Sequence, residues 1–433
     1  MPPHDPAALG LSLPLWSVAP FGGLLLSIAL LPLLAPSLWA RHYAKVCLAF
    51  GLPVAGFFLL RAPVELLHAV LEYVSFLLLL ASLFTISGGI LLRGTLRGSS
   101  GVNCAILGAG AVLANVFGTT GASMLLIRPL LRANAHRRRK AHVVVFFIFV
   151  VANIGGALTP IGDPPLFLGY LRGVPFFWTL RAMALLWAVA IGMVIAVFWL
   201  VDRRAFALDE AEATESGASV PSSALGHPWP SSAEGARVPL SIEGKINLPL
   251  LGVVIGAVFL PTPWREMAMT AAAAVSLWKT PAKAREENEF TWHPIGEVAI
   301  LFAGIFATMI PALLILKARG AGLGVVTPAH FFWATGALSS FLDNAPTYLT
   351  FFSLAQGLGG AQAVAGVSAP LLQAIGAGAV FMGAISYIGN APNFMVKAIA
   401  EEAGIRMPSF FGYMAWSCGV LLPIFVLLTL LFF

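Results

Sequence analysis

Two aspartates lie in short polar interruptions of otherwise apolar stretches. Asp163 is followed directly by two prolines, and Asp343 is followed by Asn344. An ionised carboxylate at membrane depth costs at least ~2.5–3.5 kcal/mol on insertion scales, so such a group tends to bind a proton or a cation. A proton and a sodium ion that compete for one carboxylate would produce antiport. We therefore predict that Asp163 and Asp343 couple proton movement to sodium binding, although either side chain could instead cap a helix.

Neutral side chains with oxygen atoms accompany both aspartates. Carboxylate, amide and hydroxyl oxygens suit a hard cation such as sodium, and no Cys/His set there suits a transition metal. The predicted sodium ligands are Asp163, Asp343, Asn115 and Asn344. The predicted ion- or substrate-binding residues are Asn115, Thr119, Thr120, Asn153, Thr159, Asp163, Ser340, Asp343, Asn344, Thr347, Ser386, Asn390 and Asn393. The neutral residues could alternatively serve helix packing and backbone hydrogen bonding.

The interruptions occur twice in the chain. Segment 156–165 returns as 383–392 at an offset of 227, segment 110–121 aligns with 336–347 at 226, and the His68-x3-Glu72 pair aligns with His293-x3-Glu297 at 225. Three segments at nearly one spacing indicate an internal duplication. In an apolar chain, duplicated Gly/Pro-rich interruptions predict a binding site at the middle of a membrane transporter. The two His/Glu pairs are expected to form i,i+4 contacts at helix ends, and a coupling role for Glu72 and Glu297 is the alternative.

The composition places the chain in a lipid bilayer. Hydrophobic residues make up 59% of 433 residues and charged residues 10%, against about 25% charged residues in soluble domains. The net charge of +6 is interpreted as membrane topology rather than nucleic-acid binding. The basic stretch 137–140 is interpreted as a cytoplasmic anchor. The three cysteines show no metal-binding spacing and no obvious pairing.

The elements that must position the site are membrane helices, so the predicted fold class is an all-α polytopic membrane protein. The first repeat, 1–204, holds spans 21–40, 44–60 and 66–92, a re-entrant hairpin 102–133, a broken helix 141–172 and a span 176–201. The second repeat, 246–433, holds spans 246–262, 265–280, 294–317 and 408–432, a hairpin 328–358 and a broken helix 368–403. Five spans are an odd number, so the second repeat is expected to be inverted.

Segment 205–245 is rich in Ser, Ala, Gly, Pro and Glu and is predicted to be a flexible cytoplasmic linker. With both termini outside a cell (inner) membrane, 18 of the 25 Lys and Arg residues fall inside and six outside. This bias agrees with the positive-inside rule.

Two motifs resemble a known family. Residues 153–163 read Asn-Ile-Gly-Gly-Ala-Leu-Thr-Pro-Ile-Gly-Asp and resemble the N-x-G-G-x-x-S/T-P-I-G-D stretch of NhaD-type sodium/proton antiporters. Residues 342–347 resemble the L-D-N-x-x-T hairpin tip of the wider ion transporter superfamily, which includes arsenite permeases, citrate–metal transporters and divalent-anion/sodium symporters. NhaD-type proteins carry that tip in the half that holds P-I-G-D, whereas this chain carries it in the other half.

The resemblance implies a protomer of two domains, in which a scaffold dimerises and a transport domain moves as an elevator. The sodium sites that it implies are Asn115, Thr119, Thr120 and Asp163 in one half, and Asp343, Asn344, Thr347, Ser386 and Asn390 in the other. The predicted function is sodium/proton antiport, with sodium and protons as transported ions and no other cofactor. Alternative predictions are sodium- or metal-coupled symport of a di- or tricarboxylate such as citrate and, behind it, an arsenite or oxyanion permease. The expected partners are the bilayer, a small ion or molecule and a second copy of the chain, and neither nucleic-acid binding nor enzymatic activity is predicted.

Overall fold

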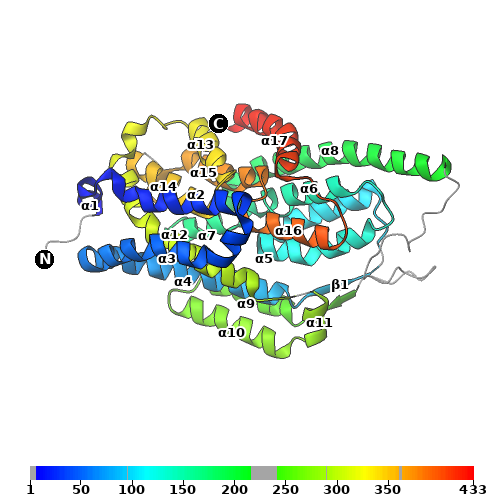
Figure 1. The fold of residues 1–433 in the computed structure, drawn as a ribbon, viewed down its shortest axis with the longest axis horizontal. Coiled ribbons are helices and arrows are strands. Elements are labelled where there is room, and N and C mark those ends of the chain that lie inside the picture. The colour runs from blue at the N-terminus through cyan, green and yellow to red at the C-terminus, as the bar shows by residue number, and fades with distance from the viewer. Residues whose placement is uncertain (1–5, 95, 216–240, 289, 360–362) are drawn as a thin grey trace.

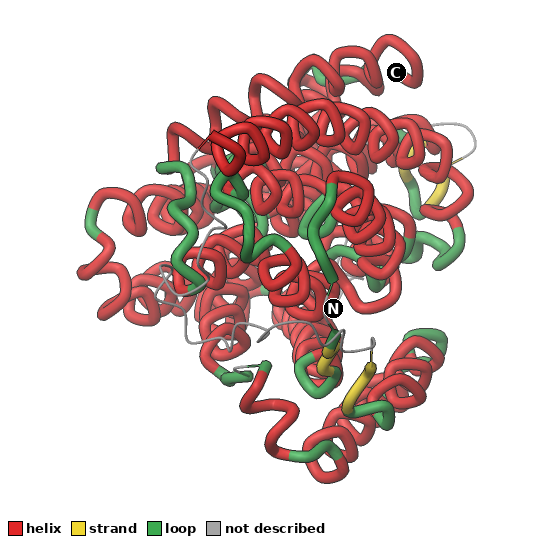
Figure 2. The backbone as a smooth tube through the Cα atoms, turned by 90° about the vertical axis from the view of Figure 1, so that its right-hand side faces the viewer, coloured by secondary structure: helices red, strands yellow, loops and turns green. Residues whose placement is uncertain are grey.

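The computed structural model describes all residues except 1–5, 95, 216–240, 289 and 360–362 (Figure 1). The described chain is almost entirely helical, and its strands are confined to two short pairs at the periphery (Figure 2). The described residues include eight helices that are long and apolar enough to cross a membrane. The protein is therefore a helical, multi-pass membrane protein.

The N-terminal helices turn at prolines. They are α1 (Pro6–Ser12), η1 (Leu15–Val18), α2 (Ala19–Leu34), α3 (Pro36–Arg61) and α4 (Pro63–Ser87). The boundary between the first two expected spans, 21–40 and 44–60, lies at Ala35 rather than at 41–43, because Pro36 lacks an N–H and begins the next helix. The third expected span, 66–92, also ends early, since Leu91–Arg93 forms strand β1.

Helix α5 (Ser100–Ala133) is a hairpin, although it is long enough to count as one of the eight candidate spans. Gly118 breaks it with φ 74° and ψ 158°, a conformation that favours glycine. The Gly98 amide donates to the Ala133 carbonyl at 2.8 Å, and the amide side chains of Asn103 and Asn134 exchange hydrogen bonds at 2.9 and 2.8 Å. The two ends of the segment therefore lie side by side, as a re-entrant hairpin requires.

Two helices are interrupted in the same manner. The first runs through α6 (Ala141–Val150), η2 (Ile154–Leu158) and α7 (Pro164–Leu171), and the second through α15 (Ala369–Met382), η5 (Gly383–Ile385) and α16 (Ala391–Glu402). Extended backbone precedes α7 at Asp163, with φ −143°, and α16 at Asn390, with φ −151°. A proline in the first turn of each resumed helix removes a backbone donor there.

The remaining elements complete the bundle. The helices are α8 (Trp178–Glu215), α9 (Asn247–Ala257), α10 (Trp264–Lys279), α11 (Ala282–Glu287), α12 (His293–Arg319), η4 (Gly320–Leu323), α13 (Pro328–Ser339), α14 (Asn344–Leu358) and α17 (Phe410–Phe432). Strand β1 pairs antiparallel with β2 (Ser241–Glu243), so that Leu91 faces Glu243, and β3 (Ala363–Val364) pairs with β4 (Val367–Ser368). Helices α13 and α14 occupy the stretch predicted as the second hairpin.

The expected linker 205–245 is shorter than predicted, because α8 continues to Glu215 and Ser241–Glu243 forms a strand. Its central part, 216–240, lies outside the described residues. The strand pair β1–β2 and helix α11 lie toward the same end of the molecule as the C-terminal part of α8 (Figure 1).

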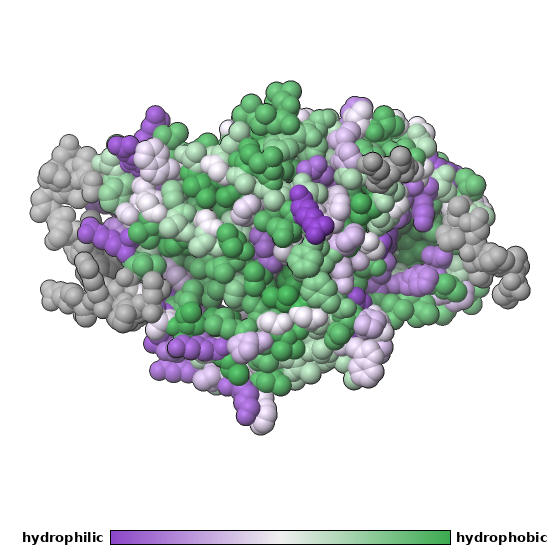
Figure 3. Space-filling model, turned by 180° about the vertical axis from the view of Figure 1, so that it is seen from behind, coloured by the Kyte–Doolittle hydropathy of each residue, from purple (hydrophilic) through white to green (hydrophobic). Residues whose placement is uncertain are grey.

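Burial separates the inner elements from the lipid-facing ones. In the candidate span Ala141–Leu158, 89% of the most apolar window is buried, against 22% in Pro36–Arg61. On the face that Figure 3 shows, apolar side chains dominate the middle, and hydrophilic ones are more frequent toward the two ends. The interrupted helix α6–η2 is therefore enclosed by protein, where backbone that leaves the helix can find partners.

Candidate ion-binding site

Asp163 lies where the interrupted elements meet. Its side chain is 1% exposed. One carboxylate oxygen, Oδ1, accepts hydrogen bonds from Thr119 Oγ1 at 2.8 Å and Asn390 Nδ2 at 3.1 Å, and Oδ2 accepts from Asn344 Nδ2 at 2.5 Å. These donors come from the tip of hairpin α5, the extended residue before α16 and the first residue of α14. One carboxylate therefore joins both hairpins and both broken helices.

The local sequence leaves this carboxylate available for tertiary contacts. Asp163 is the N-cap residue of α7, yet its side chain makes no capping bond. Pro164 and Pro165 occupy the first helical positions and have no N–H to donate. The sequence left helix capping open as a role for Asp163, but in the structure its side chain does not cap α7.

Asn115 and Thr159 join the first hairpin to the first broken helix. The Asn115 amide donates to the carbonyls of Ala111 and Gly155 at 2.9 and 2.7 Å, and its oxygen accepts from the Leu158 amide at 2.8 Å. Thr159 Oγ1 donates to the Asn115 carbonyl at 2.6 Å. Both side chains thus hold unwound backbone in place. Thr120, next to Thr119, is partly exposed.

The second aspartate has a different environment. Asp343 is half-buried, and its Oδ1 accepts from the Ala345 amide at 3.0 Å, so it caps α14. Thr347 Oγ1 donates to the Asp343 carbonyl at 2.9 Å. Ser340 donates to the carbonyls of its own turn and of α15, and Ser386 donates to the Ser340 carbonyl. The described bonds of these residues therefore satisfy backbone groups around the second hairpin tip.

Asparagines bridge the two broken helices beside Asp163. Asn153 Nδ2 donates to Asn393 Oδ1 at 2.7 Å, and Asn393 Nδ2 donates to the carbonyls of Gly383 and Ser386 at 2.8 and 2.9 Å. Among the described residues, buried oxygens without a hydrogen-bond partner include Asn344 Oδ1 and Asn153 Oδ1. Buried acceptors are normally paired, so oxygens of this kind near a carboxylate suit a cation.

The side chains that bond Asp163 are neutral, and no Lys or Arg belongs to the predicted set. Within the part of the chain that the structure describes, no group of three or more His, Cys, Asp or Glu side chains could hold a metal ion. Carboxylate and hydroxyl oxygens are of the kind that hard cations prefer, whereas Asn344 and Asn390 present amide nitrogens to the Asp163 carboxylate.

One ion pair near the site was not foreseen. Arg172, the C-cap residue of α7, bonds Glu72 of α4 at 3.0 Å and approaches Ser353 Oγ of α14 at 3.4 Å. The sequence suggested that Glu72 contacts His68, whereas the described ion pair of Glu72 is with Arg172. Glu72 and Arg172 are 100 residues apart, and no local pattern in the sequence links them.

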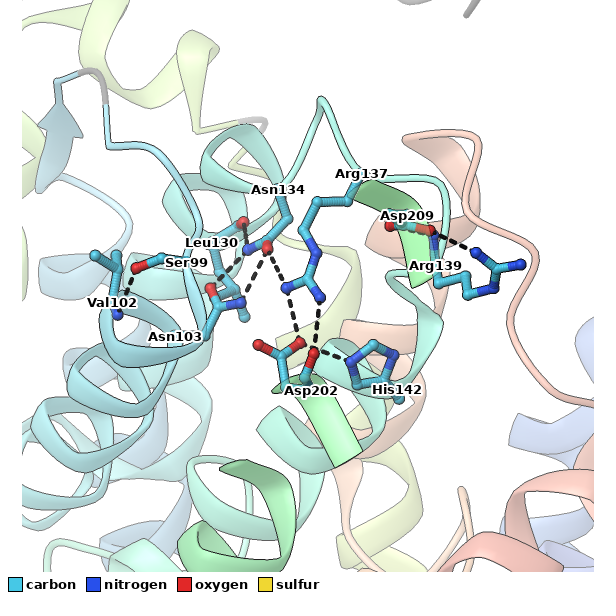
Figure 4. Close-up of polar contacts among 10 residues, drawn as sticks. All are labelled: Ser99, Val102, Asn103, Leu130, Asn134, Arg137, Arg139, His142, Asp202 and Asp209. Atoms are coloured by element: carbon cyan, nitrogen blue, oxygen red, sulfur yellow. Dashed lines mark hydrogen bonds and ion pairs between the residues drawn. The ribbon is translucent and has the colours of Figure 1, made fainter. Parts of the chain in front are cut away.

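A second ionic cluster lies at the base of the first hairpin (Figure 4). Arg137 Nη1 and His142 Nε2 each lie 2.7 Å from Asp202 Oδ1, and the side chains of Arg137 and Asp202 are 1% and 0% exposed. Arg137 also donates to Asn134 Oδ1 at 3.2 Å. The basic stretch 137–140 is thus only partly a surface anchor, because Asp202 compensates the charge of Arg137 in the interior.

The enclosed, interrupted helices and the buried carboxylate are features of a multi-pass transporter that binds its cargo within the membrane. Residues 10–433 match the family model described as "Putative citrate transport", and the chain belongs to this family. The family supports a transporter of the ion and citrate type and does not single out NhaD-type antiporters. A search of curated proteins finds no match.

Proposed function

We propose that the protein is a secondary active transporter that exchanges sodium ions for protons at Asp163. The observation that carries this proposal is the burial of one carboxylate among neutral side chains from both hairpins and both broken helices. Burial without a cationic side-chain partner disfavours an ionised carboxylate, so the group tends to bind a proton or a cation. Both ions would use the same group, so the binding of one displaces the other.

The two occupied forms need different hydrogen bonds. A protonated Asp163 has an O–H group, and Asn344 Oδ1, which lacks a described partner, could accept from it once the amide rotates, because Nδ2 faces the carboxylate in the structure. An ionised Asp163 supplies oxygens to sodium, and Asn344 Oδ1 can join them after rotation of the amide. Since Asn344 begins α14, the identity of the bound ion would influence how the second hairpin packs against the first broken helix.

Alternating access completes the proposal. We assign the movement to an elevator-type transport domain built from the hairpins and broken helices of two inverted repeats, which slides against a dimeric scaffold. The termini lie outside the cell (inner) membrane in this scheme. The enclosed position of α6–η2 among the other helices supports this assignment.

Carboxylate transport is the second candidate, and membership in a family described by citrate transport favours it. A citrate trianion would meet Asp163 and Asp343 without a basic residue in the predicted set. A citrate–metal complex carries less negative charge, and the same oxygens could then contact its metal. The site therefore favours cation exchange, while the family favours citrate.

Flux in reconstituted vesicles separates the two functions. Vesicles that contain a pH-sensitive dye receive an outward proton gradient and then external sodium, lithium, or citrate with and without magnesium. Antiport predicts proton efflux that depends on sodium, is lost in Asp163→Asn and persists without citrate. Citrate uptake without sodium/proton exchange would contradict the primary proposal and establish the second candidate.

A further inference from the structure

The Glu72–Arg172 ion pair connects a long outer helix to the short helix that carries Asp163. Arg172 Nη2 lies 3.0 Å from Glu72 Oε2, and the side chains are 20% and 22% exposed. Asp163 and Arg172 flank α7 at its two ends, and an eight-residue helix spans only about 12 Å. A displacement of α7 that follows an exchange of ions at Asp163 therefore reaches Arg172 directly.

We treat helices α7 and α14 as one unit, although α14 also packs extensively against α12, which in turn packs on α4. They pack against each other more extensively than α7 packs against α4. Asn344, the first residue of α14, bonds Asp163, and Ser353 farther along α14 lies 3.4 Å from Arg172. The two helices are thus joined near both ends of α7, and Glu72 is the group that links this unit to α4 by charge.

Two other ion pairs between distant elements are built differently. Arg137 and Asp202 are almost fully buried, and separating them would leave uncompensated charges in the interior. Arg93 of β1 bonds both Glu243 and Glu287, so its charge is held by two carboxylates. Glu72 and Arg172 are about one-fifth exposed, whereas Arg137 and Asp202 are almost fully buried. Separating Glu72 from Arg172 should therefore cost less than separating the buried pair.

We propose that Glu72 and Arg172 form a latch that must open in each transport cycle as the α7–α14 unit moves past α4. The inference rests on the proposed function to the extent that the protein is a transporter with alternating access. The latch also specifies where the moving parts slide past each other, since α4 lies on one side of this boundary and α7 with α14 lies on the other. Neither residue needs to contact the transported ion, so both act as positioning residues.

Reversible cross-linking tests the latch. For this test, Cys47, Cys104 and Cys418 are first replaced by serine, and the resulting protein is the parent of both variants. One variant adds Glu72→Cys and Arg172→Cys across the proposed boundary, and its matched control adds Arg172→Cys and Ser353→Cys within the α7–α14 unit. A reducible bifunctional thiol reagent joins each pair, and flux is compared before and after reduction.

The latch predicts at least a tenfold loss of flux in the cross-linked Glu72/Arg172 variant and recovery on reduction, because the boundary cannot shift while it is bridged. The control pair retains its flux when cross-linked, and sodium still stabilises both cross-linked proteins. Equal flux in the cross-linked and reduced Glu72/Arg172 variant would overturn the latch. Flux is followed with sodium and with citrate–magnesium, so a protein that transports citrate alone would refute antiport while its citrate flux still tests the latch.

Charge exchange provides a second test. Glu72→Arg and Arg172→Glu each place like charges together. Because this destabilises the closed latch, each variant should change flux about tenfold relative to the parent. The double variant restores an ion pair and should return flux to within about threefold of the parent. Single variants with the flux of the parent chain would contradict a role for the ion pair.

Discussion

Replacement of Asp163 by asparagine should abolish stabilisation by sodium without unfolding the protein. Relative to the ionised parent, the change makes three hydrogen bonds neutral, from about 1.5–3 to about 0.5–1.5 kcal/mol each, a loss of about 3–4.5 kcal/mol. It also removes the several kcal/mol that a buried ion costs, so the two effects nearly cancel. The new amide faces Asn344, whose side chain can turn its unpartnered Oδ1 toward it. The variant should therefore fold.

The magnitude of the sodium effect follows from linkage. Sodium at 100 times its dissociation constant stabilises the folded protein by about 2.7 kcal/mol. With the per-residue unfolding entropy of globular proteins, this amounts to a rise in Tm of about 3 °C for a chain of 433 residues. Asp163→Asn removes the charged ligand, so its Tm should not respond to sodium.

Thermal unfolding in detergent measures this difference, with choline chloride in place of sodium chloride as the reference salt. Asp343→Asn is the matched control, because asparagine caps helices as well as aspartate does and Asp343 bonds the Ala345 amide. The control should keep the sodium response. A rise in Tm with sodium that is equal in Asp163→Asn and the parent would refute the assignment of the ion site to Asp163.

Three further changes test other parts of the account. Thr119→Val removes a hydroxyl that donates to Asp163 and should weaken sodium affinity about 10- to 100-fold in a titration; unchanged affinity would count against the contact. Gly162→Ala drives a Cβ into the Gly156 carbonyl oxygen and should yield little folded protein on size exclusion, whereas Gly192→Ala meets nothing within 4 Å and should fold normally. Arg137→Met should lower the free energy of unfolding by up to about 3–5 kcal/mol, and adding Asp202→Leu should recover part of this loss, since His142 then loses its bond to Asp202; equal unfolding temperatures of the parent and Arg137→Met would contradict the buried pair.

The sequence predicted the interruptions well because Gly and Pro act locally. Gly118 can adopt a φ of 74°, and the prolines after Asp163 lack an N–H. Both features interrupt a helix for a local reason. The structure also brings Thr119, Asn344 and Asn390 onto Asp163, as expected for elements whose polar groups avoid lipid. Periodicity did not place helix boundaries, since Pro36 moved one of them and α8 continued beyond its apolar part.

Contacts between distant residues could not be derived from local patterns. Both aspartates looked equivalent in sequence, yet Asp343 finds a backbone amide within its own turn, whereas prolines deny Asp163 such a partner. Burial of Arg137 depends on Asp202, which lies 65 residues away. The partner of Glu72 likewise comes from a separate helix. A hydropathy profile shows that charged residues are rare, but it does not show which charged residues contact each other.

Proton release on sodium binding tests the central claim most directly. Purified protein in weakly buffered detergent solution is titrated with sodium at a pH at which Asp163 is protonated, and the released protons are counted with an indicator dye. The account predicts about one proton released for each sodium ion bound, and none in Asp163→Asn. Sodium binding without proton release, or equal release by the variant, would contradict exchange at this carboxylate.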